Sequence, residues 1–288
     1  MAKIKFIVLV LFTALIASCS SGDDDNDNTN IPSTDGSFDF VYNNEMKKVN
    51  SWEAKKMDDY MQVKGITSDG IRFNFVFNVY GNLYQAITFG TSAGSSVTDH
   101  ETSEIFTSNT FTFTLEELNT ANKKVKVKFS GKMYTDGYDV ESDFIVVSGS
   151  FDIPYSNLTP DIPGLGTSAK FDGTDWHGMA FDSSTTGSQI TTLNVQNDGE
   201  YSLGIVFPKG DLKTGTFPFT GNDFPNRVSL EKFDVSTDEF IDYNVSGTIT
   251  YTTVGNNYVE GTFSLTATHP ENDSKIVITE GKFKEMTK

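Results

Sequence analysis

Apolar and polar residues alternate along several stretches of the chain, and this alternation limits the possible folds more than any other feature. Successive side chains of a β-strand point to opposite faces, so a period of two is typical of antiparallel sheet covered on one face. A helical period is nearly absent, since only residues 114–119 would allow a single helical turn. The pattern predicts an all-β protein. The alternating stretches are residues 71–80, 111–115, 124–129, 201–207, 249–251 and 263–267.

Turn sequences separate these stretches. Asp69-Gly70 and Asp198-Gly199 each lie between two alternating runs, which is a strong signal for a β-hairpin. The spacing predicts about seven or eight short strands in each half of the chain, arranged as an antiparallel β-sandwich or a small, lipocalin-like β-barrel. Both arrangements stay open, because closure depends on the stagger between strands.

The two halves of the chain resemble each other, which predicts two tandem domains. A tryptophan opens each half, and its spacing to two later glycines is similar in both. The residues that we align are Trp52, Gly131 and Gly149 in the first half, and Trp176, Gly261 and Gly281 in the second. Prolines and glycines cluster between the halves, as in a linker. We predict one β-domain over residues 37–156, a linker over 157–167 and a second β-domain over 168–288.

The beginning of the chain has the three parts of a secretory signal peptide. Two lysines precede an apolar run over residues 6–16, and small residues lead into Cys19. The run is shorter than the ~20 residues that a membrane-spanning helix needs. We therefore predict a signal peptide over residues 1–18.

Ile16-Ala17-Ser18-Cys19 resembles the lipobox of bacterial lipoproteins. The resemblance implies that the Cys19 thiol carries a diacylglycerol, that the chain is cleaved before it, and that the new amino group is acylated. Two or more acyl chains anchor a protein stably to a membrane. Cys19 is the only cysteine, so the chain has no internal disulfide and no cysteine-built zinc site.

Residues 20–28 contain no apolar residue and many acidic ones, so they cannot form a packed core. We predict a lipidated, disordered tether over residues 19–36. An acidic run directly after the lipidated cysteine resembles the surface-export signal of Bacteroidota lipoproteins. That resemblance implies display on the outer face of the outer membrane, with the periplasmic face as the alternative.

The chain has 22 basic and 39 acidic residues, a net charge of −17. Nucleic acids and anionic lipids repel such a surface, so neither is expected as a partner. Three features together resemble the uncharacterised tandem β-domain lipoproteins of Bacteroidota. They are the lipobox, the acidic run and the Gly-x-Phe sequence that ends each half. This resemblance implies a surface or periplasmic lipoprotein with all-β domains, and it implies no activity.

Two short motifs imitate functional sites without their structural context. Residues 90–94 spell the nucleophile elbow of serine hydrolases around Ser92, but the residues that follow begin a helix poorly. Residues 164–169 resemble a dinucleotide loop, but prolines precede them and a strand follows. The histidines His100, His177 and His269 are scattered. We predict no enzymatic activity, no cofactor and no metal.

Tyrosines beside predicted loops are the best candidates for contacts with a ligand, because the ring offers contact area and a polar tip. Tyr80 and Tyr84 flank one such loop, and Tyr134 and Tyr138 flank another. The alternative is that they are ordinary strand residues next to turns. Each tryptophan is interpreted as a core anchor more readily than as a sugar-stacking platform.

The lysine stripe at 124, 126 and 128 has two interpretations, a contact for an anionic glycan or a solvated strand face that discourages aggregation. For the whole protein, the sequence predicts a cell-surface, lipid-anchored binding module for a glycan or a protein. The alternative is a structural or accessory lipoprotein of an outer-membrane assembly, which should expose a contiguous apolar patch. A barrel carrying a hydrophobic ligand would need an unfilled interior, and 24 phenylalanines favour a filled one.

Overall fold

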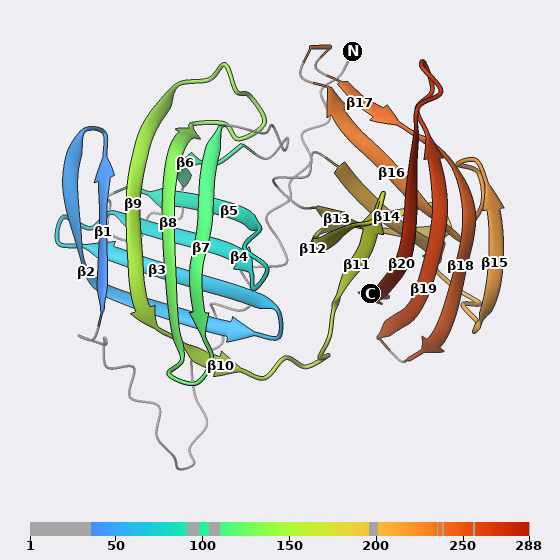
Figure 1. The fold of residues 1–288 in the computed structure, drawn as a ribbon, viewed down its shortest axis with the longest axis horizontal. Coiled ribbons are helices and arrows are strands. Elements are labelled where there is room, and N and C mark those ends of the chain that lie inside the picture. The colour runs from blue at the N-terminus through green and yellow to red at the C-terminus, as the bar shows by residue number, and fades with distance from the viewer. Residues whose placement is uncertain are drawn as a thin grey trace. The chain divides into compact units, whose positions relative to one another are not determined.

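The computed structural model describes residues 36–90, 98–103, 110–195, 201–234, 236–237, 239–255 and 257–287. Within these ranges the regular structure consists of β-strands alone, which form two sheets (Figure 1). The all-β prediction is therefore confirmed, whereas the helical turn allowed at residues 114–119 is part of a strand. Across the same ranges no helix is long and apolar enough to cross a membrane.

The first domain is a closed barrel. Strands β1, β2, β3, β4, β5, β6, β8 and β9 form a ring that closes where β9 and β2 both pair with β1. Strand β7 pairs with β8 outside this ring, and β10 adds to β2 in parallel. The strands are β1 (Ser37–Tyr42), β2 (Glu45–Met57), β3 (Tyr60–Thr67), β4 (Arg72–Asn78), β5 (Leu83–Phe89), β6 (Thr98–Glu101), β7 (Phe111–Asn119), β8 (Lys124–Tyr134), β9 (Phe144–Pro154) and β10 (Ser156–Leu158).

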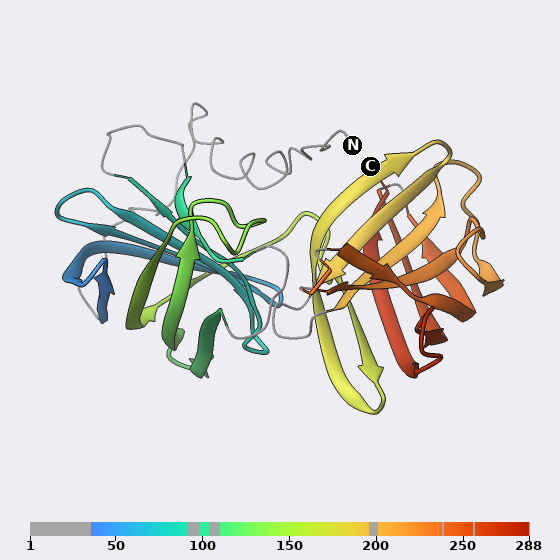
Figure 2. The ribbon, with the colours of Figure 1, turned by 90° about the horizontal axis from the view of Figure 1, so that it is seen from above.

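The second domain is a curled half-barrel, and Figure 2 shows its curvature. Its sheet runs β15-β18-β19-β20-β11-β12-β13-β14-β16-β17 with antiparallel neighbours, and β15 and β17 are its edges. The strands are β11 (Gly166–Phe171), β12 (Thr174–Thr186), β13 (Gln189–Val195), β14 (Tyr201–Pro208), β15 (Gly215–Thr220), β16 (Arg227–Asp234), β17 (Glu239–Asp242), β18 (Asn244–Val254), β19 (Tyr258–Thr268) and β20 (Lys275–Met286).

The strands differ from the sequence prediction in number and extent. Within the described residues each sheet has ten strands, more than the seven or eight expected. The predicted linker over residues 157–167 contains the end of β10 and the beginning of β11. Strands of three or four residues, such as β10, β6 and β17, are too short to show a period in the sequence.

Phenylalanines fill the closed barrel. The rings of Phe73 and Phe75 lie 4.3 Å apart between centroids, and those of Phe75 and Phe129 lie 4.8 Å apart. An eight-stranded barrel is just wide enough for side chains to fill it. This packing argues against a hydrophobic ligand carried inside the barrel. The buried rings are Phe38, Phe40, Phe73, Phe75, Phe77, Phe113, Phe129 and Phe151.

The hairpin that opens each domain fixes which positions correspond. The last cross-strand pair before each two-residue turn is Tyr42–Glu45 in one domain and Phe171–Thr174 in the other. Glu45 and Thr174 are the first paired residues after the two turns, so we count positions from them. Trp176 comes two residues after Thr174, whereas Trp52 comes seven residues after Glu45. The prediction that the tryptophans match was therefore wrong. Similar spacings to the later glycines concealed a shift of position within the strand.

The closing glycines do correspond. Gly149 pairs with Phe129, and Gly281 pairs with Phe263. A Cβ atom at Gly149 would lie 2.8 Å from the Phe129 ring, and one at Gly281 would lie 2.5 Å from the Phe263 ring. Both positions require glycine, because an aromatic ring from the neighbouring strand occupies the space of a side chain.

Candidate functional site

The four candidate tyrosines do not form one surface. Tyr80 lies in the turn between β4 and β5 and is 51% exposed, and Tyr138 lies in the loop between β8 and β9 and is 47% exposed. Strands β5 and β8 are both antiparallel to β6. The turn before β5 and the loop after β8 therefore lie at opposite ends of the barrel. Tyr84 is partly buried within β5.

The prediction that Tyr134 is exposed beside a loop was wrong. Strand β8 continues through this residue, which pairs with Phe144 and is only 2% exposed. Burial raises the pKa of its hydroxyl. At the opposite end of the barrel, the Tyr80 hydroxyl donates to the Asp59 carboxylate at 3.2 Å.

The lysine stripe is neutralised by carboxylates. Lys124 lies 3.1 Å from Asp152, and Lys126 and Lys128 lie 3.2 and 2.5 Å from Glu116 on β7. Hydrogen bonds from Lys128 and Lys126 lower the pKa of Glu116. These pairs favour the interpretation as a solvated face over a site for an anionic glycan.

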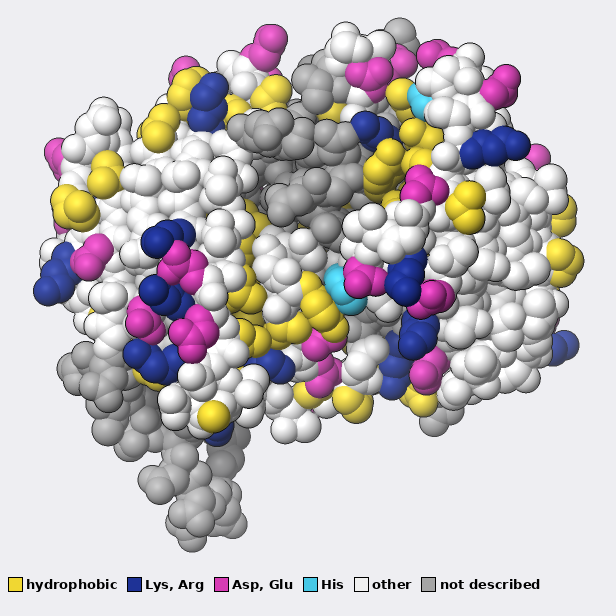
Figure 3. All heavy atoms as spheres, viewed as in Figure 1, with side chains coloured by type: hydrophobic (Ala, Val, Ile, Leu, Met, Phe, Trp, Pro, Cys, Tyr) yellow, Lys and Arg dark blue, Asp and Glu magenta, His cyan; other side chains and the backbone are white. Residues whose placement is uncertain are grey.

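Exposed apolar side chains lie near the ends of β1, β2 and β9, and Figure 3 shows apolar side chains on the first domain as separate spots among uncoloured atoms. Met46 is 71% exposed, Val146 is 56% exposed and Phe144 is 46% exposed. Val41 pairs with Met46 on one side and with Ser148 on the other. Residues two apart on a strand share a face. Val41, Met46, Phe144 and Val146 therefore lie on the outer faces of three neighbouring strands, and we name them the β1–β9 patch.

A cation lies beside the patch. Lys132 on β8 pairs with Val146 across the strands. Its ammonium group lies 4.1 Å from the centre of the Phe144 ring, which is a cation–π contact. This contact holds the one exposed aromatic ring of the patch in place.

The loop between β8 and β9 is acidic and ordered by its own hydrogen bonds. The Tyr138 amide donates to Asp136 Oδ1 at 3.0 Å, and the Glu141 amide donates to Asp139 Oδ1 at 2.9 Å. Asp136, Asp139, Glu141 and Asp143 are all exposed, and we name residues 135–143 the acidic loop. Among the ion pairs within the described ranges, none involves these four carboxylates.

The sequence reasoning missed the patch, although a signal for it was present. Residues 144–147 are four apolar residues in succession. In a strand with one face on the core, such a run must expose alternate members. The loss of alternation at the start of β9 was the sign of an apolar outer face.

A second set of polar groups is buried in the half-barrel. Glu285 is 2% exposed, and its Oε1 atom accepts hydrogen bonds from Thr167 Oγ1 at 2.7 Å and from Asn194 Nδ2 at 2.9 Å. Burial raises the pKa of Glu285 to about 7. No described residue forms a hydrogen bond with Asn194 Oδ1 or Thr192 Oγ1, which are both buried. We name Thr167, Thr192, Asn194 and Glu285 the polar cluster.

The closed barrel is apolar at the corresponding positions. Phe38 and Thr167 are each the fourth residue before the last hairpin pair, and they pair with Phe151 and Phe283. Two residues further along, β9 has Ile153 where β20 has Glu285. The Phe38 ring also lies against Gly65, where a Cβ atom would be 2.6 Å away. The corresponding positions therefore hold phenylalanine and isoleucine in one domain, and threonine and glutamate in the other.

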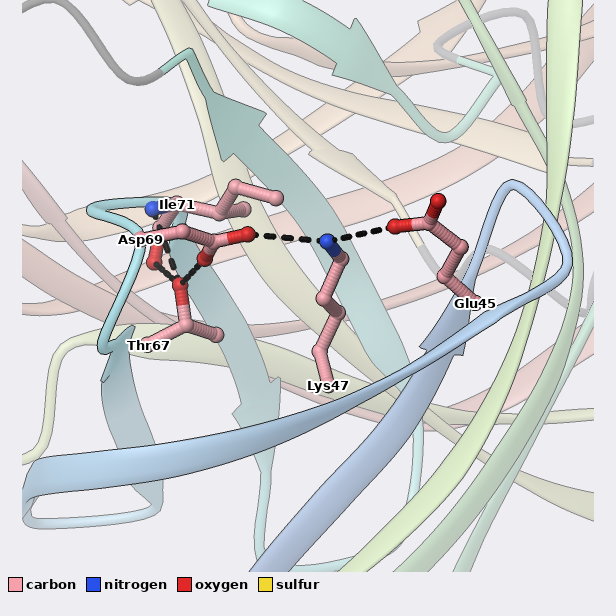
Figure 4. Close-up of polar contacts among 5 residues, drawn as sticks. All are labelled: Glu45, Lys47, Thr67, Asp69 and Ile71. Carbon is pink, nitrogen blue, oxygen red and sulfur yellow. Dashed lines mark hydrogen bonds and ion pairs between the residues drawn. The ribbon is translucent and has the colours of Figure 1, made fainter.

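At the hairpin end the closed barrel has the polar side chains (Figure 4), and the half-barrel has the apolar ones. Lys47 occupies the position of Trp176, and its ammonium group lies 2.8 Å from both Glu45 and Asp69. Asp69 also accepts a hydrogen bond from Thr67. In the half-barrel Trp176 is 4% exposed and stacks on Phe171 with 5.1 Å between ring centroids, which fits its interpretation as a core anchor.

Tyr42, Asp99 and His100 form a further titratable cluster at this end of the closed barrel. The Tyr42 hydroxyl donates to the Asp99 carboxylate, which lies 3.1 Å from His100 Nδ1. Burial, followed by the hydrogen bond to Asp99, raises the pKa of Tyr42. Tyr42 therefore stays protonated at neutral pH and acts as a hydrogen-bond donor to Asp99.

Cys19 and Ser92 lie outside the described residues. Within the described ranges, histidine, aspartate and glutamate side chains form no group of three or more that could hold a metal ion. No protein-family model, no curated protein and no solved structure matches the chain.

Proposed function

We propose that this protein is a lipid-anchored, non-catalytic binding protein of the cell surface, and that it binds a protein ligand on the β1–β9 patch. The patch itself carries the proposal. Met46, Phe144 and Val146 are each about half exposed or more, and they lie on the outer faces of β2 and β9, on either side of β1. Several exposed apolar residues on one face of a domain mark an interaction site, because water contact with them is unfavourable.

A protein ligand fits the patch better than a glycan does. The patch residues have no polar side-chain atoms for sugar hydroxyl groups, and only Phe144 offers a ring. The most exposed tyrosines, Tyr80 and Tyr138, lie at opposite ends of the barrel and cannot flank one sugar chain. Aliphatic and aromatic anchors surrounded by polar residues are typical of protein interfaces.

The position of the patch suits a tethered protein. Strand β1 begins at Ser37, directly after the predicted tether, and Val41 lies near the other end of this strand. The proposed binding surface therefore lies at the end of β1 remote from the attachment point.

Anchoring is tested by labelling growing cells with an alkyne analogue of palmitate. We expect label on the natural chain and none on Cys19→Ala, and protease added to intact cells should degrade the natural chain. Label that persists in the variant would overturn the anchor. Protection from protease would place the protein on the periplasmic face instead.

Binding is tested with a photo-crosslinking amino acid at position 146 of the full chain on intact cells. The matched control places it at Val277, an equally apolar residue that is 45% exposed on β20 of the second domain. We expect a discrete protein adduct from position 146 alone, which Met46→Asp should abolish. An absence of adducts, or the same adducts from both positions, would overturn the proposal.

An accessory subunit of an outer-membrane assembly remains the second candidate, because it would use the same patch. The two functions differ in stoichiometry and persistence. A subunit should copurify with its partner in a fixed ratio after detergent extraction, whereas a receptor-like binding protein should be isolated largely alone.

A further inference from the structure

We infer the chemistry of the partner: the β1–β9 patch and the acidic loop together bind a protein surface with an apolar centre beside lysine or arginine side chains. This inference rests on the proposed function and adds the charge of the ligand. The acidic loop adjoins the patch directly, because Asp143 precedes Phe144 in the chain. The Thr135 amide donates to the Asp143 carbonyl at 2.8 Å, which closes the loop against β9.

The acidic loop is preorganised. The Gly137 amide donates to Glu101 Oε1 on β6 at 3.1 Å, and the Asp139 and Ser142 amides each donate to a loop carbonyl at 3.0 Å. A loop that is already ordered loses little conformational entropy on binding. Its carboxylates are therefore held beside the patch before any partner arrives.

The charge of this rim determines which partners fit. The acidic loop carries four exposed carboxylates and leads through Asp143 directly into Phe144, while the nearby Lys132 already lies over the Phe144 ring. Complementary charge at the rim of an interface accelerates association and excludes partners of the same sign. A lysine- or arginine-bearing protein gains from this rim, whereas an anionic glycan or membrane is repelled.

A second copy of the chain does not fit the same surface. A symmetric pair would use the same patch on both copies. Two acidic loops would then approach one interface in a protein whose net charge is −17. Like charges close to an interface disfavour the complex.

The test uses the crosslinking chain with the probe at position 146 and replaces the four loop acids by their amides. The variant carries Asp136→Asn, Asp139→Asn, Glu141→Gln and Asp143→Asn. Asparagine keeps the Oδ1 acceptors that cap the loop amides, so the loop retains its hydrogen bonds. The control variant carries four such changes at exposed acids of the second domain: Asp211→Asn, Glu260→Gln, Glu271→Gln and Asp273→Asn.

We expect the loop variant to form the adduct about tenfold more slowly at low salt, and the control variant to match the natural chain. The difference should vanish in concentrated salt, which screens rim charges. The crosslinked peptide of the partner, read by mass spectrometry, should contain lysine or arginine.

An unchanged rate in the loop variant, an acidic crosslinked peptide, or a peptide from the chain itself would overturn this inference and leave the proposed protein binding intact. No adduct from the natural chain would instead overturn the proposed function. The two failures are therefore distinguishable.

Discussion

The two domains share the hairpin that opens them, but they place polar side chains at opposite ends of the strands. In the closed barrel the hairpin end holds Lys47 with its two carboxylates, and the other end holds Phe38 and Ile153. In the half-barrel the hairpin end holds Trp176, and the other end holds Glu285. The strand pattern is therefore retained while the positions of the polar side chains differ between the domains.

The partners are less complete in the half-barrel. Lys47 lies near the surface and contacts two carboxylates, whereas Glu285 is fully buried and no cation contacts it among the described residues. Among the described residues, four buried side-chain atoms of the half-barrel and two of the closed barrel lack a hydrogen-bond partner. They are Trp176 Nε1, Thr192 Oγ1, Asn194 Oδ1 and Arg227 Nε in the half-barrel, and Trp52 Nε1 and Asn74 Oδ1 in the barrel. A buried polar group without a hydrogen bond costs about 1–3 kcal/mol. We therefore expect the half-barrel to be the less stable domain at neutral pH.

Each domain contains one tryptophan, so the domains can be followed separately. In Trp176→Phe the remaining fluorescence comes from Trp52 in the barrel, and in Trp52→Phe it comes from Trp176 in the half-barrel. Urea titration of these two variants of the full chain gives one unfolding curve for each domain.

The largest effect should follow from removing a ring inside the barrel. Phe75 is fully buried, and its ring contacts those of Phe73, Phe129 and Phe151. We expect Phe75→Ala to lower the unfolding free energy of the barrel by about 4 kcal/mol, since it removes apolar contacts and leaves a cavity. The Trp52 signal should shift and the Trp176 signal should not. Equal shifts in both signals would mean that the domains unfold as one unit.

The next effect should come from the buried carboxyl group and depend on pH. The folded pKa of Glu285 is about 7, against an ordinary value of 4.5. Glu285 is protonated in both states below pH 4.5, so the half-barrel should lose stability as pH rises from about 4.5 to 7 and remain lower above 7. The difference in pKa corresponds to about 3 kcal/mol.

Glu285→Gln should remove this dependence, because the glutamine Oε1 can still accept from Thr167 and Asn194. We expect the half-barrel to be more stable in this variant at pH 8 and nearly unchanged at pH 4. Glu260→Gln, at an exposed position of β19, serves as the control. A half-barrel whose natural stability is flat between pH 4 and 8 would contradict the raised pKa.

A smaller loss should follow from filling the space beside Trp176. A Cβ atom at Gly178 would lie 2.3 Å from Trp176 Cη2 and 2.9 Å from Asn194 Cβ. We expect Gly178→Ala to destabilise the half-barrel by about 1–3 kcal/mol, because the ring must move to admit a methyl group. Gly210→Ala, where nothing lies within 4 Å, should change the Trp176 unfolding curve little. If both variants unfold alike, Trp176 is not held over Gly178.

The alternation of residues predicted the all-β class, because it depends only on which face of each strand meets the core. The tandem arrangement was predicted from the resemblance between the two halves. Closure could not be predicted. It depends on whether β9 reaches β1, and a pairing between strands so far apart in the sequence leaves no local signal. The prediction that the two tryptophans correspond was wrong for a related reason. Sequence spacing counts residues along loops, whereas Trp52 and Trp176 differ in their place along the strand.

The candidate site was less accessible to sequence reasoning. Turn residues correctly indicated that Tyr80 and Tyr138 would be exposed, because each lies where a strand has ended. Tyr134 was misplaced because β8 extends to it. The inward orientation of Glu285 could have been predicted from the two-residue period of a strand, since Glu285 lies two residues after Phe283 and must share its face. Its hydrogen bonds to Thr167 and Asn194 come from strands remote in the sequence, so the chain alone could not show that the carboxyl group was accommodated.

The smallest effect should come from the polar end of the barrel. The hydrogen bond from Lys47, followed by that from Thr67, lowers the pKa of Asp69. A lowered folded pKa contributes stability above the unfolded value near 3.8, and this contribution disappears as pH falls below it. Lys47→Met should therefore change the Trp52 unfolding curve slightly at pH 6 and not at pH 2.5. Because Lys47 and Asp69 lie close to solvent, 0.5 M salt should reduce the difference. A large loss of unfolding free energy that salt leaves unchanged would show that Lys47 is part of the barrel's packing, as Trp176 is in the half-barrel. The two hairpin ends would then differ in residue type but not in their contribution to stability.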